Sequence, residues 1–222
     1  MKKSIVAILF AVLWTSFSAS PLVAQRKTFL KFNPTTLVNE LDVYVSHELS
    51  PSVSLELGSG FIYTDYWDNV LNQFDFGQIK PHISEHQYLN AKGFNGRLGV
   101  RFYVISPYTE NAKARGTYFE PVLLYKQIWY PHDDKELDSK NYIEKGKKYV
   151  TGLQLLIGRQ YQRKKIYFDK YIGLGVRAKT YSFDNFEVNE GNGDVQNNGK
   201  RTTSWLPSIH LGIKIAFDLS RH

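Results

Sequence analysis

The chain has 222 residues, a formal net charge of +7, an aromatic content of 15% and no cysteine. The missing cysteine excludes both a lipid-anchored lipoprotein and a small secreted domain held by disulfides. The length suits a single all-β domain, and the high aromatic content is typical of chains with Tyr and Trp at membrane interfaces.

The first 24 residues have the pattern of an export signal. Lys2 and Lys3 precede an apolar run over residues 5–14, and small residues follow up to Ala24. The run is too short for a transmembrane helix, so we predict a signal peptide at 1–24, cleaved near Ala24, and a mature domain at 25–222. Removing Lys2 and Lys3 from +7 leaves +5. A basic net charge is compatible with nucleic-acid binding, but export from the cytoplasm argues against such a partner.

The mature chain alternates apolar and polar residues in eight stretches, which predicts eight β-strands. No later apolar run is long enough for a membrane-spanning helix. The expected strands are 27–33, 40–49, 53–63, 93–105, 117–129, 148–161, 166–181 and 204–217.

The last stretch, 204–217, shows the alternation most clearly. Every second residue from Trp205 to Phe217 is apolar, while the residues between them are mostly small or polar. It is about twice the usual strand length and is long enough to cross a bilayer as a tilted strand. His210, Gly212, Ile215 and Phe217 also resemble the carboxy-terminal insertion signal of transmembrane β-barrels.

The connections predict an eight-stranded antiparallel up-and-down transmembrane barrel. Beyond the first hairpin, shorter connections at 50–52, 106–116 (of medium length) and 162–165 alternate with long ones at 64–92, 131–147 and 182–203. Short turns at one rim and long loops at the other are typical of outer-membrane barrels. We expect interfacial aromatics at Tyr63, Trp67, Trp129, Tyr149, Tyr181, Trp205 and, at the opposite rim, Phe217.

Charged residues fall on the set of positions expected to face inward. An eight-stranded barrel is only wide enough for its own side chains, so these charges should pair across it and block conduction. A narrow charge-selective pore is the alternative. The expected inner charges are Lys31, Asp42, Glu48, Glu56, Arg97, Arg101, Glu120, Lys126, Asp169, Arg177, Lys179 and Lys214.

Ser208 and His210 form the strongest candidate for hydrolytic chemistry, with Glu120 or Asp169 as the orienting carboxylate. Two residues of strand rise separate them by roughly 7 Å, which is too far for a nucleophile and its base. We therefore predict no enzyme activity and no catalytic, cofactor-binding or metal site. Basic clusters at 145–148 and 159–165 suit phosphate groups of lipid or lipopolysaccharide.

Several segments resemble small outer-membrane β-barrel proteins of Bacteroidota. They are 30–34, 54–58, 96–103, 171–177 and 207–212. The resemblance covers nearly the whole mature chain and implies an OmpA/OmpX-like barrel in the outer membrane, but its motifs are strand patterns and imply no catalytic residue.

The expected function is a non-enzymatic one in the outer membrane: envelope integrity, surface contact or a place in an envelope complex. Expected partners are outer-membrane lipids, lipopolysaccharide and other envelope proteins. The alternatives are a narrow channel or carrier for small or apolar solutes, an exported soluble lipid-binding barrel with apolar faces turned inward, and an enzyme acting on lipid A or phospholipid.

Overall fold

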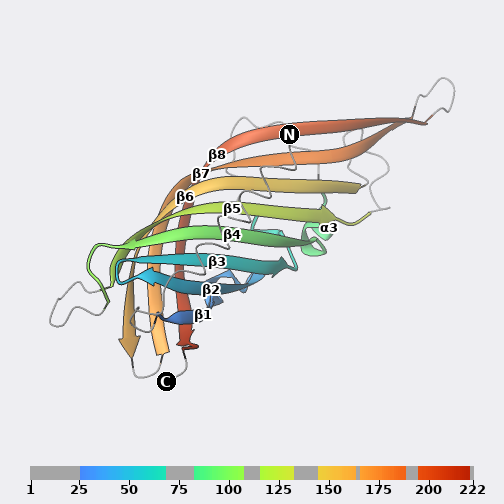
Figure 1. The fold of residues 1–222 in the computed structure, drawn as a ribbon. Coiled ribbons are helices and arrows are strands. Elements are labelled where there is room, and N and C mark those ends of the chain that lie inside the picture. The colour runs from blue at the N-terminus through green and yellow to red at the C-terminus, as the bar shows by residue number, and fades with distance from the viewer. Residues whose placement is uncertain are drawn as a thin grey trace, which may run out of the picture.

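Eight antiparallel strands form a closed barrel in chain order, β1 to β8 (Figure 1). The computed structural model describes residues 26–68, 83–107, 116–132, 145–163, 166–188 and 195–220, so the predicted signal peptide lies outside the described part. The strands are β1 (Thr28–Phe32), β2 (Glu40–Ser50), β3 (Val53–Ile62), β4 (Lys92–Tyr103), β5 (Thr117–Tyr130), β6 (Lys145–Arg163), β7 (Ile166–Val188) and β8 (Val195–Asp218).

The barrel has its apolar side chains outside and its charged side chains inside. Successive residues of β2 alternate between buried and exposed, so that Asp42 is 1% exposed and Val43 is 42% exposed. On β8, Leu211 is 70% exposed, whereas Lys214 is 2% exposed. Side chains alternate across a strand, so each strand has one apolar and one charged face. The apolar face is outside and the charged face inside, as the sequence predicts. This polarity contradicts the alternative of a soluble lipid-binding barrel, which needs its apolar faces inside.

Three strands, β6, β7 and β8, are at least five residues longer than the sequence pattern predicts. β7 and β8 have 23 and 24 residues, and every residue of β7 pairs with β8, from Ile166–Phe217 to Val188–Val195. In Figure 1, β7 and β8 bend and run on past the other strands. The predicted loop over 182–203 is therefore wrong for residues 182–188 and 195–203, which are strand. Backbone pairing does not require an apolar outer face, so the polar Asn/Gly-rich sequence continues the hairpin after the alternation ends.

The first strand is short because the chain turns after it. Pro34 lacks the amide hydrogen needed to continue the strand, and Asn33 caps a one-turn helix, η1 (Pro34–Thr36), by accepting from the Thr35 amide at 3.2 Å. β1 consequently meets β8 through only four residue pairs, from Phe32–Ile215 to Phe29–Asp218. Within the described residues, β8 has no strand on that side before Ile215.

The described parts of the connection between β3 and β4 fold over one mouth of the barrel. They include residues 63–68 and the short helix α3 (Glu85–Leu89), which begins with a reciprocal capping box between Ser84 and Gln87. The described residues contain no helix long and apolar enough to cross a membrane. We call 63–68 and 83–91 together the cap. The sequence pattern predicts only a long connection over 64–92 and does not indicate this helix.

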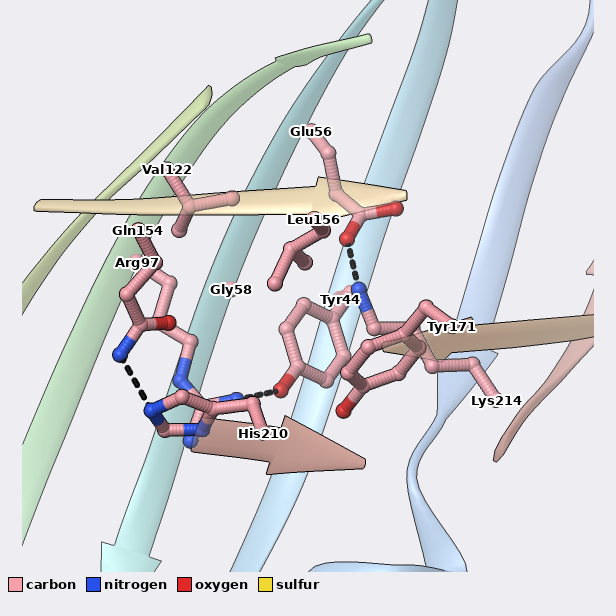
Figure 2. A pocket seen from close by; sticks show the side chains of 10 residues that line it. All are labelled: Tyr44, Glu56, Gly58, Arg97, Val122, Gln154, Leu156, Tyr171, His210 and Lys214. Atoms are coloured by element: carbon pink, nitrogen blue, oxygen red, sulfur yellow. Dashed lines mark hydrogen bonds and ion pairs between the residues drawn. The ribbon is translucent and has the colours of Figure 1, made fainter. Parts of the chain in front are cut away.

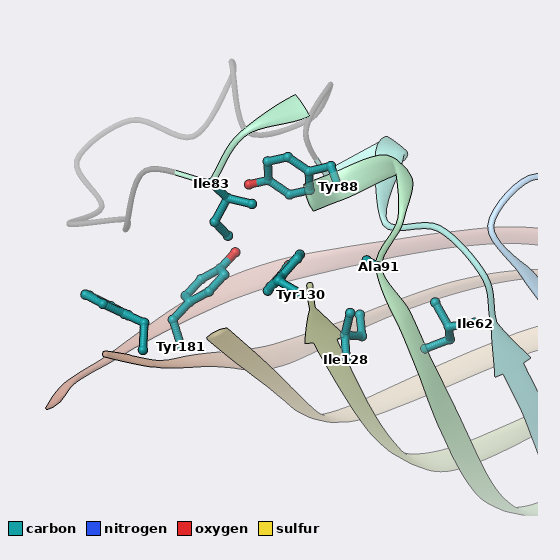
Figure 3. Packing of buried hydrophobic residues seen from close by; sticks show 8 residues of the cluster. Ile62, Ile83, Tyr88, Ala91, Ile128, Tyr130 and Tyr181 are labelled. Atoms are coloured by element: carbon teal, nitrogen blue, oxygen red, sulfur yellow. The ribbon is translucent and has the colours of Figure 1, made fainter. Parts of the chain in front are cut away.

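The cap is held by a small apolar cluster (Figure 3). Ile83, Tyr88 and Ala91 pack with inward-facing residues at the ends of the strands, among them Tyr130 and Tyr181. The rings of Tyr88 and Tyr130 meet edge to face with centroids 5.7 Å apart. The Asp65 amide donates to the Tyr88 carbonyl at 2.9 Å, which joins the two parts of the cap.

Candidate functional site: the charged barrel interior

The middle of the barrel holds a neutral set of buried charges, which we call the central cluster. Three cations and three carboxylates contribute, each from a different strand, and none of these side chains is more than 3% exposed. A cluster drawn from six strands depends on the closed barrel, because no single hairpin contains it. Its members are Lys31, Glu56, Arg101, Glu120, Asp169 and Lys214.

Glu56 connects the three cations of this cluster. It accepts from Lys31 at 2.6 Å and from Arg101 at 3.1 Å, and it also pairs with Lys214. Burying a carboxylate is costly unless opposite charges and hydrogen bonds compensate. Three cationic donors around one carboxylate provide that compensation.

Arg101 connects the other two carboxylates. Its guanidinium lies 2.8 Å from Glu120 and 2.7 Å from Asp169, and it stacks 3.8 Å over the ring of Tyr118. Tyr118 in turn donates to Asp169. The planar guanidinium bonds several acceptors at once, which a lysine cannot do in the same geometry.

A second neutral set, the rim cluster, lies nearer the cap. Arg97 pairs with Glu40 at 2.8 Å and with Asp42 at 3.2 Å, and Lys126 pairs with Glu40 at 2.6 Å. Asn95 donates to both carboxylates, at 3.0 and 2.7 Å. Two cations thus face two carboxylates, and the charge of the rim cluster is also balanced.

A third set, the cap cluster, ties the cap to the barrel wall. Lys148 pairs with Asp68 at 3.0 Å and also with Asp65, and Lys179 pairs with Asp68. Tyr130 donates to Asp65 at 2.6 Å, and Tyr181 donates to Asp68 at 3.1 Å. The cap therefore brings two carboxylates to two lysines that would otherwise lie unpaired inside the mouth.

The two cap carboxylates differ in acidity although they share Lys148. Burial raises the pKa of Asp65 by more than Lys148 lowers it, and the charge of Asp68 adds to the rise. Burial also acts on Asp68, but Lys148 and Lys179 together hold its pKa well below its usual range. Asp68 is consequently the more acidic of the two cap carboxylates.

The space left between the clusters is small. Figure 2 shows Tyr44, Arg97, Gln154, Tyr171 and His210 closing around a cavity of about 10 Å³ between the rim and central clusters. That volume has room for at most one water molecule. A second cavity, of about 110 Å³, lies under the cap.

Ser208 and His210 are in direct contact, contrary to the separation predicted from strand rise. Ser208 Oγ lies 2.5 Å from His210 Nε2, because side chains on a strand lean along it and the imidazole is long enough to reach back. The amide nitrogen of Gln154 lies 2.6 Å from the same ring nitrogen and competes for its lone pair.

The two carboxylates proposed to orient His210 do not bond to it. Glu120 bonds to Arg101, and Asp169 accepts from Tyr118 and pairs with Arg101. No carboxylate among the described residues hydrogen-bonds to the imidazole of His210. The Ser–His contact thus lacks the third member that orients the base in a hydrolytic triad.

All twelve residues expected to carry inner charge lie on the inner face. Ten are in the three clusters or directly beside them. Glu48 lies near the opposite end and accepts from the Lys27 amide at 3.2 Å, whereas Arg177 has no hydrogen bond or ion pair with any part of the chain that the structure describes. Five further members of these clusters were not predicted from the sequence: Glu40, Asp65, Asp68, Tyr118 and Lys148.

The expected aromatic positions divide between the two faces. Trp67, Trp129, Trp205, Tyr63 and Phe217 are exposed, and Tyr149 is half-buried on the outer face. Tyr181 is 2% exposed and points inward, so its place in the outer aromatic belt is wrong. It shares its face with Lys179, two residues earlier, because side chains alternate along a strand.

One basic residue assigned to lipid contact also lies inside. Lys148 was grouped with 145–148 as a candidate for outer phosphates, but it is 2% exposed and paired with the cap carboxylates. Its neighbour Lys147 is exposed on the outer face.

Comparison with known proteins gives little further information. No protein-family model matches the chain, and no curated protein matches it. A crystal structure of a major outer membrane protein from Thermus thermophilus is similar to this chain at 15% identity and a TM-score of 0.43, covering 88% of this chain and 100% of the other. A match at this level does not define the function of the chain.

The observed geometry defines the fold class of the protein. The chain is an eight-stranded antiparallel up-and-down β-barrel with apolar side chains outside and three neutral charge clusters inside.

Proposed function

We propose that this protein is an outer-membrane β-barrel that spans the bilayer and has a structural or surface-contact role without enzyme activity. The observation that carries the proposal is the reversed polarity of the barrel. Leu153, Leu174 and Ile209 on the outer face are 59, 63 and 71% exposed, while the charges pair inside. An apolar outer surface of this kind is compatible with the hydrocarbon core of a bilayer. Within that core, only helices and closed barrels hydrogen-bond all of their backbone N–H and C=O groups.

The filled interior supports the non-conducting form of this role. The central cluster, and the cavity of only about 10 Å³ beside it, support an interior filled by side chains, whereas a pore needs a continuous water path. The OmpA/OmpX-like and Bacteroidota relationship suggested by the sequence motifs remains part of this proposal. So does contact with lipopolysaccharide through the exposed Lys147, whereas the exposed Arg163 lies at the opposite rim, near the headgroups of the inner leaflet.

Cell fractionation tests the location directly. We expect the mature protein in the outer-membrane fraction, with a faster-migrating unheated form on a detergent gel, because a folded barrel resists unfolding in detergent. Recovery as a soluble periplasmic protein would contradict the proposal.

A matched pair of variants tests whether the outer face contacts lipid. Leu153→Lys places a charge on the exposed apolar face of β6, and Thr203→Lys places one on the exposed polar part of β8. In lipid vesicles, a lysine near the bilayer midplane costs about 2–4 kcal/mol and one near the interface about 0–1 kcal/mol. Equal unfolding free energies for the two variants would show that the face around Leu153 contacts water.

The absence of enzyme activity is tested separately. Expression of the wild-type protein should leave the masses of lipid A and phospholipids unchanged. A mass change that His210→Ala abolishes would instead assign hydrolytic chemistry to the Ser208–His210 contact.

A further inference from the structure

The cavity under the cap is bordered by more positive than negative charge. Its volume is about 110 Å³, enough for several waters or one small oxyanion. The charged residues that line it are four cations and three carboxylates: Lys126, Lys148, Arg177, Lys179, Glu40, Asp65 and Asp68. His210 also contributes to the lining.

Each of the three carboxylates that line the cavity already forms an ion pair with a lysine or with Arg97. Glu40 accepts from Arg97 at 2.8 Å and from Lys126 at 2.6 Å. Asp65 and Asp68 belong to the cap cluster and pair with Lys148 and Lys179. No carboxylate that lines the cavity is left to neutralise a further cation.

Arg177 is that further cation. It lies on the inner face of β7, opposite Leu206 of β8, and its Nε is buried without a hydrogen-bond partner. It forms no ion pair within the described part of the chain, although every other arginine of the inner face pairs with at least two carboxylates. A guanidinium carries five donors, and leaving them unused beside a cavity is unfavourable.

The cavity also borders the part of the wall that lacks strand pairing. Its lining includes Asn39 and Glu40 where β2 begins, and His210 of β8. Between these two strands β1 is too short to reach, because its pairing with β8 begins only at Phe32–Ile215, and η1 contacts both β2 and β8 beyond its end. A group bound at Arg177 would thus sit beside the seam between β2 and β8.

We infer that this cavity binds one small oxyanion, a phosphate or a carboxylate, with Arg177 as its main ligand and Lys126 as a second cationic contact. The planar guanidinium suits two-point binding of either group. The anion supplies the negative charge that the interior lacks at this position. It is either a free anion or the headgroup of an amphiphile that enters at the seam.

Isothermal titration of the full mature chain in dodecyl maltoside micelles tests the inference. Inorganic phosphate is the probe for a free anion and dodecyl phosphate is the probe for a headgroup. We expect saturable one-site binding of at least one probe. Arg177→Gln should weaken it about tenfold or more, as expected for loss of a charge-assisted bond. Arg201→Gln removes an exposed arginine on β8 and should leave the affinity unchanged.

The two probes distinguish the source of the anion. Binding of inorganic phosphate assigns a free anion, and binding of dodecyl phosphate alone assigns a headgroup. Binding of neither probe, or equal affinity for wild type and Arg177→Gln, would overturn the inference. If Arg177→Gln does not fold, Lys126→Gln serves as the second variant, with a weaker but measurable loss of affinity. Because the assay uses folded protein in detergent, its outcome is independent of the cellular location proposed above.

Discussion

Glu56 is the residue on which most of the buried charge depends. Replacing it by Gln removes the carboxylate shared by Lys31, Arg101 and Lys214 and leaves excess positive charge in the centre of the barrel. Removing one partner of a buried ion pair costs about 3–5 kcal/mol. We expect Glu56→Gln to lower the unfolding free energy by this amount, measured by urea unfolding in detergent micelles.

Asp218→Asn is the matched control for that prediction. Asp218 pairs with Lys27 at 3.8 Å at the end of the barrel, where the two side chains are 17 and 31% exposed. Solvent screening reduces the value of such a pair to about 0–1 kcal/mol. A cost for Glu56→Gln no larger than that of Asp218→Asn would show that the central cluster does not stabilise the barrel.

Alternation along each strand was enough to predict which strand residues face inward. The same rule, applied strictly, also places Tyr181 and Lys148 inside, since each lies an even number of residues from an inner neighbour. Asp65 and Asp68 follow no such rule because they lie outside the strands. Their pairing with Lys148 and Lys179 depends on how the cap folds back, which local sequence does not encode.

At the scale of the elements, the cap is a separate unit held mainly by two carboxylates and one apolar cluster. Asp65→Asn combined with Asp68→Asn leaves Lys148 and Lys179 without carboxylate partners in the cap. We expect the double variant to be cleaved by a protease within 63–91 at a rate at least about tenfold above wild type, because local opening becomes easier. Gel mapping of the fragments provides the measurement.

Glu85→Gln in α3 is the control for the cap variant, since it changes a carboxylate at an exposed position of the same cap. It should leave the cleavage rate close to that of wild type. Resistance of the double variant to cleavage would indicate that the apolar contacts of Ile83 and Tyr88 hold the cap without the ion pairs.

The strand ends show where sequence patterns stop being informative. Alternation identified the central part of each strand because that part has an apolar face. It failed beyond Tyr181 and before Ser204, where apolar residues no longer keep to one face and backbone pairing defines the strand. The early end of β1 was indicated by Asn33 and Pro34, which break a strand for chemical reasons.

At the scale of the whole molecule, the filled interior predicts a barrel that does not conduct ions. In planar bilayers we expect no steady ion current from the wild-type protein. The Asp65→Asn/Asp68→Asn variant should also remain silent, because the central cluster lies below the cap and still blocks the path. A wide porin reconstituted in the same way verifies insertion, and a steady wild-type current would contradict the filled interior.

The brevity of β1 has a consequence for how the barrel completes itself. Only four residue pairs join the first strand to the last, so hydrogen bonding alone specifies their alignment weakly. Lys31 supplies a second criterion: in the observed alignment its ammonium meets Glu56 and Asp169, and a slip by one residue would direct it outward. Charge pairing thus favours the correct alignment at closure, because a misaligned first strand leaves the central cluster one positive charge short.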